Sequence, residues 1–347
     1  MTEITISAHR RTLLKAGIGL GGAALLSAVP RRVRAATPDK INIAFFTETS
    51  PSAIAKGEGW LEDVTKAKIN WIEVGSGAEI NTAIAAGSVD IGVGIGSAPT
   101  AAGLSQSIGY QVIYIRDNIG PAEELTVRTA ANIKKPSDLI GKKVGVPFGS
   151  TSHFRLLGFL KTNGLTQKQV TVLDLRSDAL VAAWQRGDID AAYVWAPAKS
   201  KILAAGGEVF RTYDKLEKAG YVIADLIVAR TAFAEAYPDT VVAILKAENR
   251  ALDVWTSTPD KAADIIGKQA GVTADVAKAD LLEYDFVAPK RQLEANWLGT
   301  PGHVGRFAEV LQGTAKFLAE QKSIRTVPDL SVFQKGINTV PLTKSIA

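Results

Sequence analysis

Two short segments contain residue types that bind small anions. Gly94-Ile95-Gly96-Ser97-Ala98-Pro99 follows one predicted strand, and Gly149-Ser150-Thr151-Ser152 follows another. Glycine lets backbone N–H groups approach an anion, and the first N–H groups of a helix have no partner within the helix. A serine at a helix start is also an ordinary N-cap. Because the two loops occur together, we predict that they hold an anionic group with Gly96, Ser97, Ser150, Thr151 and Ser152.

Two carboxylates and one tryptophan are candidates for contacting the rest of such a ligand. Asp225 lies within the apolar stretch 221–228, and a carboxylate there needs a partner, which a ligand ammonium would supply. Glu123 precedes another predicted strand and is a second candidate, with a solvated hinge as the alternative. Trp195 ends an apolar strand, where it is either a core residue or a cleft wall over ligand methylenes or a cationic head group.

The residue inventory argues against catalysis and metal binding. The chain has no cysteine, and beyond the first 36 residues it keeps two of its three histidines, His153 and His303, so a metal cluster has few ligands to use. Ser150 to Ser152 stand beside His153 but lack a nucleophile-elbow pattern, and no Gly-Lys-Ser/Thr phosphate loop occurs. We therefore predict a protein that is not an enzyme, with no catalytic residue, no metal and no cofactor.

The net charge of +5 is concentrated at the start of the chain. Up to Ala36 there are six basic residues and one acidic residue, which leaves 34 basic and 34 acidic residues from totals of 40 and 35. A body with balanced charge has no general attraction for phosphate backbones, so we predict no nucleic-acid binding. With 347 residues and 46% hydrophobic composition, the chain is long enough for a two-lobed globular protein.

Residues 1–36 have the pattern of a signal peptide. Segment 9–15 opens a weakly apolar run, 16–29, that is too short to span a membrane, and small residues place a cleavage site near Ala36 or Thr37. The adjacent Arg10 and Arg11 resemble a twin-arginine export signal. We expect export to the periplasm by that route. Because no cysteine is present to carry a lipid, we expect no lipid anchor.

Short apolar runs alternate with Ala-rich amphipathic stretches, which predicts an α/β fold. The predicted strands are 41–46, 69–74, 89–93, 125–128, 142–147, 170–175, 191–195 and 225–229. The predicted helices are 52–67, 78–86, 153–162, 178–186, 232–237, 239–256, 259–269, 274–284 and 303–321.

Two parts of the chain share one pattern. Segments 85–91 and 185–191 both read as a helix, a terminal glycine, two residues, an aspartate and a strand, which predicts two related modules. We expect lobe 1 to comprise residues 37–126 and 225–347, and lobe 2 to comprise residues 127–224. Two crossing strands would then form a hinge, with a cleft between the lobes.

Several segments closely resemble the periplasmic taurine-binding proteins of ABC importers. They are Ser76-Gly77-Ala78, residues 83–96, residues 142–157 and above all Ala182-Ala183-Trp184-Gln185-Arg186-Gly187-Asp188-Ile189-Asp190-Ala191-Ala192-Tyr193-Val194-Trp195-Ala196-Pro197. The resemblance implies a type II periplasmic-binding fold, no catalytic activity, and a membrane permease with its ATPase as partners. We expect a monomer.

The resemblance also implies roles for residues. Gly96, Ser97 and Ser150 to Ser152 would hold a sulfonate, Trp195 would shape the cleft, Asp225 would take an amine, and Glu123 is a possible second contact. The loop 47–52 departs from the family sequence, which bears on the identity of the ligand. Other alkanesulfonates, nitrate or a thiamine-precursor pyrimidine remain alternative ligands, and an enzyme on the same fold is the alternative from another class.

Overall fold

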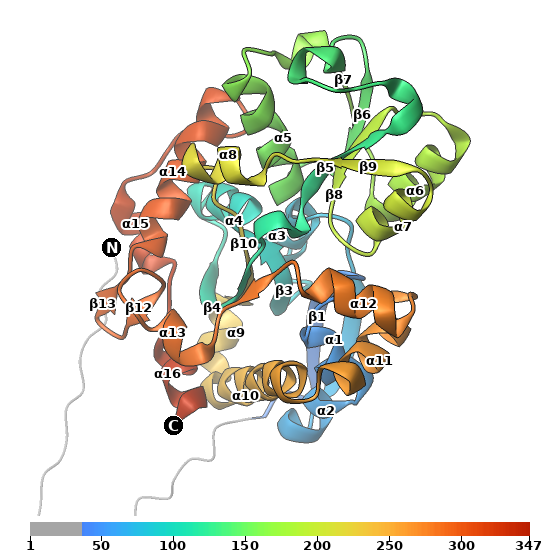
Figure 1. Ribbon diagram of the computed structural model, residues 1–347. Helices are drawn as coiled ribbons and strands as arrows, with labels where there is room; N and C mark the ends of the chain where they lie inside the picture. The colour runs from blue at the N-terminus through green and yellow to red at the C-terminus, as the bar shows by residue number, and fades with distance from the viewer. Residues whose placement is uncertain (1–36) are drawn as a thin grey trace, which may run out of the picture. The chain divides into compact units, whose positions relative to one another are not determined.

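The computed structural model describes residues 37–347, so the predicted signal peptide lies outside the described residues. The chain forms two mixed β-sheets with helices packed on them (Figure 1). The six-stranded larger sheet has the order β11-β4-β10-β3-β1-β2. Its strands are β1 (Lys40–Phe45), β2 (Lys68–Glu73), β3 (Ile91–Gly96), β4 (Tyr110–Asn118), β10 (Ala224–Arg230) and β11 (Asp285–Phe286).

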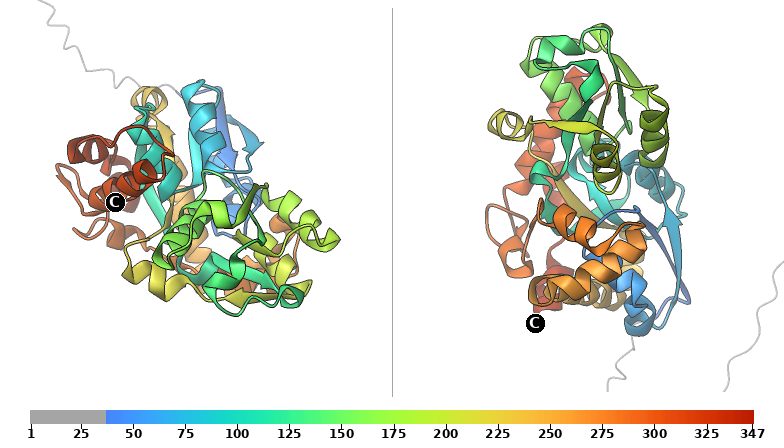
Figure 2. Two further views of the ribbon diagram at one scale, coloured as in Figure 1. Left: turned by 90° about the horizontal axis from the view of Figure 1, so that it is seen from above. Right: turned by 45° about the vertical axis from the view of Figure 1, so that its right-hand side comes forward.

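The five-stranded smaller sheet has the order β7-β6-β8-β5-β9. Its strands are β5 (Glu124–Arg128), β6 (Lys143–Val146), β7 (Thr171–Asp174), β8 (Ala191–Val194) and β9 (Gly207–Phe210). In the right-hand view the green to yellow segment with this sheet lies above the blue strands of the larger sheet (Figure 2). The central strands β3 and β8 are buried along their whole length, as expected for strands of a mixed sheet with helices on both faces.

The chain crosses between the sheets twice. It leaves the larger sheet at the end of β4 and enters β5 through the 3₁₀ turn η1 (Gly120–Ala122), and it returns into β10. Strand β5 runs antiparallel to the central strand β8, and β10 runs antiparallel to the central strand β3. The fold class predicted from the sequence is confirmed. The exact lobe boundaries stay a prediction.

Helices connect and cover the strands. Those before the first crossing are α1 (Ser52–Gly57), α2 (Trp60–Thr65), α3 (Gly77–Ala85) and α4 (Ser97–Ser105). Those between the crossings are η2 (Thr129–Ala131), η3 (Pro136–Leu139), α5 (Thr151–Thr162), η4 (Gln167–Gln169), α6 (Ser177–Arg186), α7 (Ala198–Ala204) and α8 (Tyr213–Lys218). Those after β10 are α9 (Thr231–Ala236), α10 (Pro238–Ser257), α11 (Pro259–Ala270), α12 (Ala274–Leu281), α13 (Pro289–Gln292), α14 (Phe307–Glu320), α15 (Leu330–Lys335) and α16 (Val340–Ile346).

Two predicted helices are wrong in detail. The helix expected over 52–67 is divided into α1 and α2, because Gly59 adopts a left-handed conformation with φ 66°. The helix expected from His303 begins at Phe307, because β12 (Gly299–Thr300) and β13 (His303–Val304) form a hairpin. No helix among residues 37–347 combines the length and the apolar character needed to cross a membrane.

The joint shared by the two modules has the same geometry in both. Gly87 after α3 and Gly187 after α6 are left-handed, with φ 71° and 78°. The N–H that follows each glycine donates to the carbonyl five residues earlier, which is a Schellman ending. Asp90 then accepts from the Asn42 N–H at 2.9 Å, and Asp190 accepts from the Lys143 N–H at 2.8 Å. Each aspartate therefore ties a central strand to its parallel neighbour.

Candidate functional site

One cavity lies where loops from both sheets meet. Six of the eight residues predicted from the sequence line it. The full lining is Phe46, Glu48, Gly77, Gly94, Gly96, Pro99, Glu123, Ser150, Thr151, Trp195 and Asp225. Its volume is about 20 Å³, which is space for about one water molecule. Most of these residues lie at or just after the ends of parallel strands, or at the start of the antiparallel β5 and β10, so they gather at one end of each sheet.

The start of α4 forms the larger sheet's contribution to an anion site. Gly96 is the extended residue before the helix, and a Cβ added there would lie 2.4 Å from Thr151 Cγ2. Glycine is therefore required by the close approach of the two loops. Ser97 lies behind the lining, where it is fully buried and its Oγ accepts from the Ala224 N–H at 3.3 Å.

The start of α5 forms the smaller sheet's contribution. Ser150 is its N-cap: its Oγ accepts from the His153 N–H at 3.1 Å and donates to the Pro147 carbonyl at 2.6 Å. Thr151 Oγ1 donates to Glu123 Oε1 at 2.7 Å. Ser152 is fully buried behind the lining. The Ser150 hydroxyl is already hydrogen-bonded within the helix start. The N-terminal N–H groups and the dipole of α5 are therefore the features that could stabilise an anion.

A buried guanidinium holds three carboxylates beside this cavity. Arg116 Nε donates to Asp117 Oδ2 at 2.8 Å, and Nη2 donates to Asp225 Oδ2 at 2.7 Å. Nη1 and Nη2 both donate to Glu48. The sequence analysis expected Asp225 to need a ligand as its partner, whereas the protein itself supplies Arg116. One positive charge against three carboxylates still leaves the cluster with excess negative charge.

Burial and mutual repulsion shift the pKa of these groups. Burial raises the pKa of Asp117 to about 6, although Arg116 opposes the shift. The pKa of Asp225 is raised well above its ordinary value by burial and by Asp117. Burial also raises the pKa of Glu123 to about 7, against the hydrogen bond from Thr151. Each of these carboxyl groups is therefore stabilised as an anion by a cation that enters the cavity.

Two aromatic rings close one side of the cavity. Trp195 is 6% exposed and lies edge-to-face on Phe46, with ring centroids 5.8 Å apart at 84°. Phe46 follows β1 and Trp195 follows β8, so the pair joins the two sheets. The arrangement gives the cavity an apolar wall suited to ligand methylenes.

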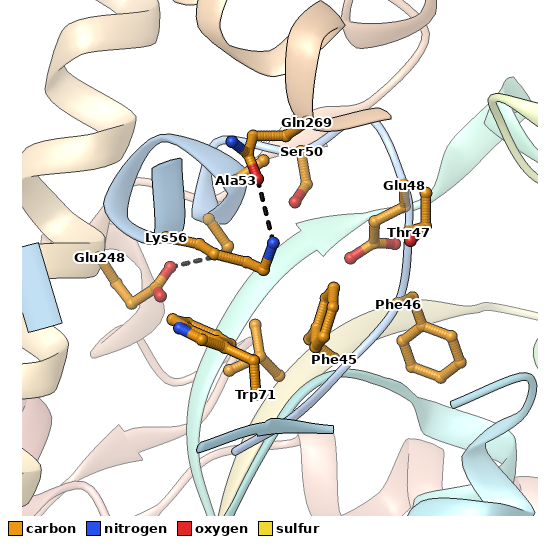
Figure 3. A pocket seen from close by; sticks show the side chains of 12 residues that line it. Phe45, Phe46, Thr47, Glu48, Ser50, Ala53, Lys56, Trp71, Glu248 and Gln269 are labelled. Atoms are coloured by element: carbon orange, nitrogen blue, oxygen red, sulfur yellow. Dashed lines mark hydrogen bonds between the residues drawn. The ribbon is translucent and has the colours of Figure 1, made fainter. Parts of the chain in front are cut away.

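A second cavity lies on the other side of Phe46 and Glu48, which line both (Figure 3). Its volume is about 30 Å³. Lys56 Nζ donates to Gln269 Oε1 at 3.0 Å and lies 4.7 Å from the Phe45 ring centroid. The Lys56 ammonium thus already has partners within this second cavity.

His153 stands beside the serine loop 150–152 but is not arranged as a base for a serine hydroxyl. His153 Nδ1 accepts from the Gly149 N–H at 3.4 Å, and its ring stacks on Phe148 with centroids 4.3 Å apart. Burial lowers the pKa of His153 to about 4. Its imidazole makes no hydrogen bond to a serine hydroxyl within residues 37–347. In the same part of the chain, no group of three or more His, Cys, Asp or Glu side chains is placed to hold a metal ion.

Sequence reasoning missed Arg116, Asp117 and Glu48. Arg116 and Asp117 lie on β4, a strand that was not among those predicted. Two charged residues directly after a largely apolar run, 110–115, were the available signal. Glu48 lies in the loop 47–52, which the sequence had marked only as a departure from the family pattern.

The sequence of the chain assigns it to a class of proteins. Residues 47–262 match the family described as NMT1/THI5 like. The chain is 34% identical over 297 residues, 83% of its length and 88% of the relative's, to the taurine-binding periplasmic protein of Escherichia coli (strain K12). It belongs to the NMT1/THI5-like family and to the group of binding proteins that includes this relative, which confirms the predicted resemblance.

Other similarities agree with this assignment. A putative aliphatic sulfonates-binding protein of Bacillus subtilis (strain 168) is 30% identical over 65% of this chain and 68% of its own. The alkanesulfonate-binding protein SsuA from Xanthomonas axonopodis pv. citri, bound to MOPS, has the same fold with a TM-score of 0.74 at 21% identity, covering 88% of this chain and all of its own. The desulfurization enzyme DSZB also has this fold, with a TM-score of 0.60 at 16% identity over 89% of this chain and 99% of its own.

Proposed function

We propose that this protein is the substrate-binding component of an ABC importer, which captures taurine in the periplasm and delivers it to the membrane permease and its ATPase. The observation that carries the proposal is one cavity combining two helix N-termini with the carboxylates of Glu123 and Asp225. Taurine is a zwitterion with a sulfonate and an ammonium at opposite ends, so it needs both kinds of contact. The similarity to the taurine-binding relative supports the same ligand.

In this proposal the sulfonate binds at the starts of α4 and α5, and the ammonium faces Asp225 and Glu123. Trp195 and Phe46 flank the methylenes between the two charged ends. Because the cavity has space for about one water molecule, a larger ligand enters only when the two sheets move apart at the crossings 119–123 and 219–223. Ligand contacts to both sheets then favour the closed arrangement that the permease recognises.

We propose binding without chemical conversion. The buried, stacked position of His153 supports this choice, because the ring faces Phe148 and the Gly149 N–H rather than a serine hydroxyl. The similarity to an enzyme of the same fold makes catalysis the alternative worth testing. Mass spectrometry of taurine and of an aryl sulfinate after incubation with the protein should recover both unchanged, and any product would contradict the proposal.

A ligand panel tests the proposal directly. The panel consists of taurine, ethanesulfonate, nitrate and glycine betaine, measured by thermal shift and calorimetric titration. It distinguishes a site that requires both a sulfonate and an ammonium from a site that requires only one charged group. We expect taurine to raise the melting temperature most. Tightest binding of ethanesulfonate would favour the aliphatic sulfonates suggested by the Bacillus relative. A response to nitrate or to glycine betaine, with none to taurine, would overturn the ligand assignment.

We propose further that the precursor leaves the cytoplasm by the twin-arginine route. The adjacent Arg10 and Arg11 and the weakly apolar run after them support this choice. In a host with that export system, Arg10→Lys with Arg11→Lys should leave the precursor in the cytoplasm. Normal export of the double variant would favour the general secretory route instead.

A further inference from the structure

Glu48 occupies an unusual position at the candidate site. It lies in the loop between β1 and α1, is 8% exposed, and lines both cavities. Figure 3 shows its side chain directed inward from this loop, while the neighbouring Thr47 hydroxyl donates to the exposed Glu73 at 2.7 Å. A buried carboxylate needs a compensating charge or a set of donors.

Arg116 compensates Glu48 only in part. Its guanidinium is shared among Glu48, Asp117 and Asp225, so each carboxylate receives a fraction of one positive charge. Lys56, the cation in the second cavity, donates to Gln269 and lies over the Phe45 ring. The edge of the larger sheet is therefore negative at the point where Glu48 and Asp225 meet the cavity.

A carboxylate oxygen of Glu123, on the other wall of the cavity, also favours a cationic ligand group. Glu123 is 3% exposed and lines the cavity. Its Oε1 accepts from Thr151, but its Oε2 has no hydrogen-bond partner within residues 37–347. A buried carboxylate oxygen without a donor is costly, and a ligand N–H⁺ group would satisfy it.

The backbone of β3 holds the Glu48 carboxylate in place. At Gly94, which has φ 80°, an added Cβ would lie 2.7 Å from Glu48 Oε1 and 2.9 Å from Arg116 Nη1. The ion pair thus packs directly on the strand, beside Gly96 and the start of α4. This packing limits the movement of the carboxylate, so its charge acts at a defined point of the cavity wall.

We propose that Glu48 is a specificity-determining residue that contributes a carboxylate contact to the ammonium of the ligand. The site then takes a small primary aminoalkanesulfonate in preference to the plain alkanesulfonate of the same length. The inference rests on the proposed function and adds a residue and a selection rule to it. The rule is electrostatic, because an anion without an ammonium would face Glu48, Asp225 and Glu123 with no charge of its own to balance them.

The test is the ratio of two affinities measured by calorimetry on the mature full-length protein. Taurine and ethanesulfonate share the sulfonate and the two-carbon chain, so their ratio isolates the ammonium. Glu48→Gln keeps the shape and the hydrogen-bond acceptor but removes the charge. We expect it to weaken taurine binding by at least about 10-fold, as for a charge-assisted hydrogen bond. Ethanesulfonate should bind equally well or more tightly, because one repulsive charge is gone.

Two further variants keep the result interpretable. Glu73→Gln makes the same chemical change at an exposed residue that contacts the neighbouring Thr47, and it should leave the ratio unchanged. Glu48→Asp keeps the charge but withdraws it by one methylene, and it should lower the ratio less than Glu48→Gln. If Glu48→Gln does not fold, a lowered ratio for Glu48→Asp supports the inference and an unchanged ratio overturns it.

The outcomes separate this inference from the proposed function. Wild-type protein that binds taurine, together with a Glu48→Gln variant whose ratio equals that of wild type, overturns only the role of Glu48. Wild-type protein that binds neither sulfonate overturns the proposed function, and the role of Glu48 with it.

Discussion

The larger and smaller sheets share one strand order but present different chemistry to the cavity. The larger sheet contains the order β2-β1-β3-β10-β4, and the smaller sheet has the order β7-β6-β8-β5-β9. In each order, three parallel strands are followed by an antiparallel crossing strand and then by one final strand. The Gly87 and Gly187 helix endings and the Asp90 and Asp190 strand ties correspond as well. The shared architecture places a helix start of each module at the cavity.

The side chains around those helix starts differ in charge. The larger sheet brings Glu48, Arg116 and Asp225, which form a buried and negative cluster. The smaller sheet brings Ser150, whose hydroxyl caps α5, the wall residue Trp195, and a single carboxylate, Glu123, which accepts from Thr151. The repeated framework supplies two similar helix starts at the cavity. In our proposal these helix starts bind the anion, and carboxylates in the loops and on the strands bind the cation.

The largest expected effect concerns Arg116, on which the negative cluster depends. Arg116→Gln leaves three buried carboxylates without their cation, so we expect the free energy of unfolding to fall by about 3–5 kcal/mol. Arg186→Gln removes an exposed arginine of the smaller module, where Arg186 and Asp188 are 63% and 51% exposed, and should cost about 1 kcal/mol or less. Urea denaturation of both variants measures the difference. A loss below about 1 kcal/mol for Arg116→Gln would show that Arg116 is not needed to compensate the three carboxylates.

The second prediction places a negative charge on the smaller sheet's half. Ser150→Asp retains a good N-cap for α5 but sets a carboxylate beside the proposed sulfonate. We expect taurine and ethanesulfonate both to bind more weakly, by about 2–4 kcal/mol. Ser150→Asn caps the helix without charge and should bind both ligands nearly as well as wild type. Calorimetry with equal loss for Asp and Asn would show that the anion does not bind at α5.

The third prediction uses the pKa of Glu123, which is about 7 in the folded protein. A carboxyl group with a raised folded-state pKa contributes stability that is full below its ordinary pKa and is lost as pH rises through the folded value. Glutamine mimics the protonated form at every pH. Relative to wild type, Glu123→Gln should therefore gain about 2–3 kcal/mol between pH 4.5 and pH 8.

Denaturation curves of both proteins across this pH range test the third prediction. His153, whose lowered pKa gives the opposite pH dependence, is present in both proteins and cancels in the difference. A difference in stability that stays constant with pH would mean that Glu123 is ionised throughout.

The smallest of these effects is the loss of one carboxylate from the cation-binding half. Asp225→Ala should weaken taurine binding by about 1.5–3 kcal/mol, as for a charge-assisted hydrogen bond, and should spare ethanesulfonate. Asp225→Asn, which keeps the shape, should behave alike. The two ligands compared by calorimetry sharpen the contrast with Ser150→Asp, which affects both. Unchanged taurine affinity would remove Asp225 from the site.

Local patterns in the sequence predicted most of the elements near the cavity. β1, β3, β6 and β8 are apolar runs, and β3 and β6 are followed directly by Ser97 and Pro147, so these strands and the loops after them were recognisable. The break at Gly59 was missed, because apolar residues continue at helical spacing on both sides of it. The hairpin 299–304 was missed because its strands are only two residues long.

The partner of Asp225 was beyond the reach of such patterns. Arg116 is 109 positions away along the chain from Asp225 and 68 positions away from Glu48. Asp225 lies opposite Asp117 on β4 and opposite Gly96 on β3, and irregularities in the pairing of β10 set this register. A shift of one residue would turn the carboxylate to the other face of the sheet.

By itself the sequence established the α/β alternation, the repeated joint, the family resemblance and the two loops suited to an anion. Helix starts and glycine turns are local, so a few adjacent residues specify them. Only the tertiary structure decided that Glu48, Arg116 and Asp225 form one charged cluster beside those loops. Strand register and burial bring these side chains together, and both depend on residues far apart in the chain.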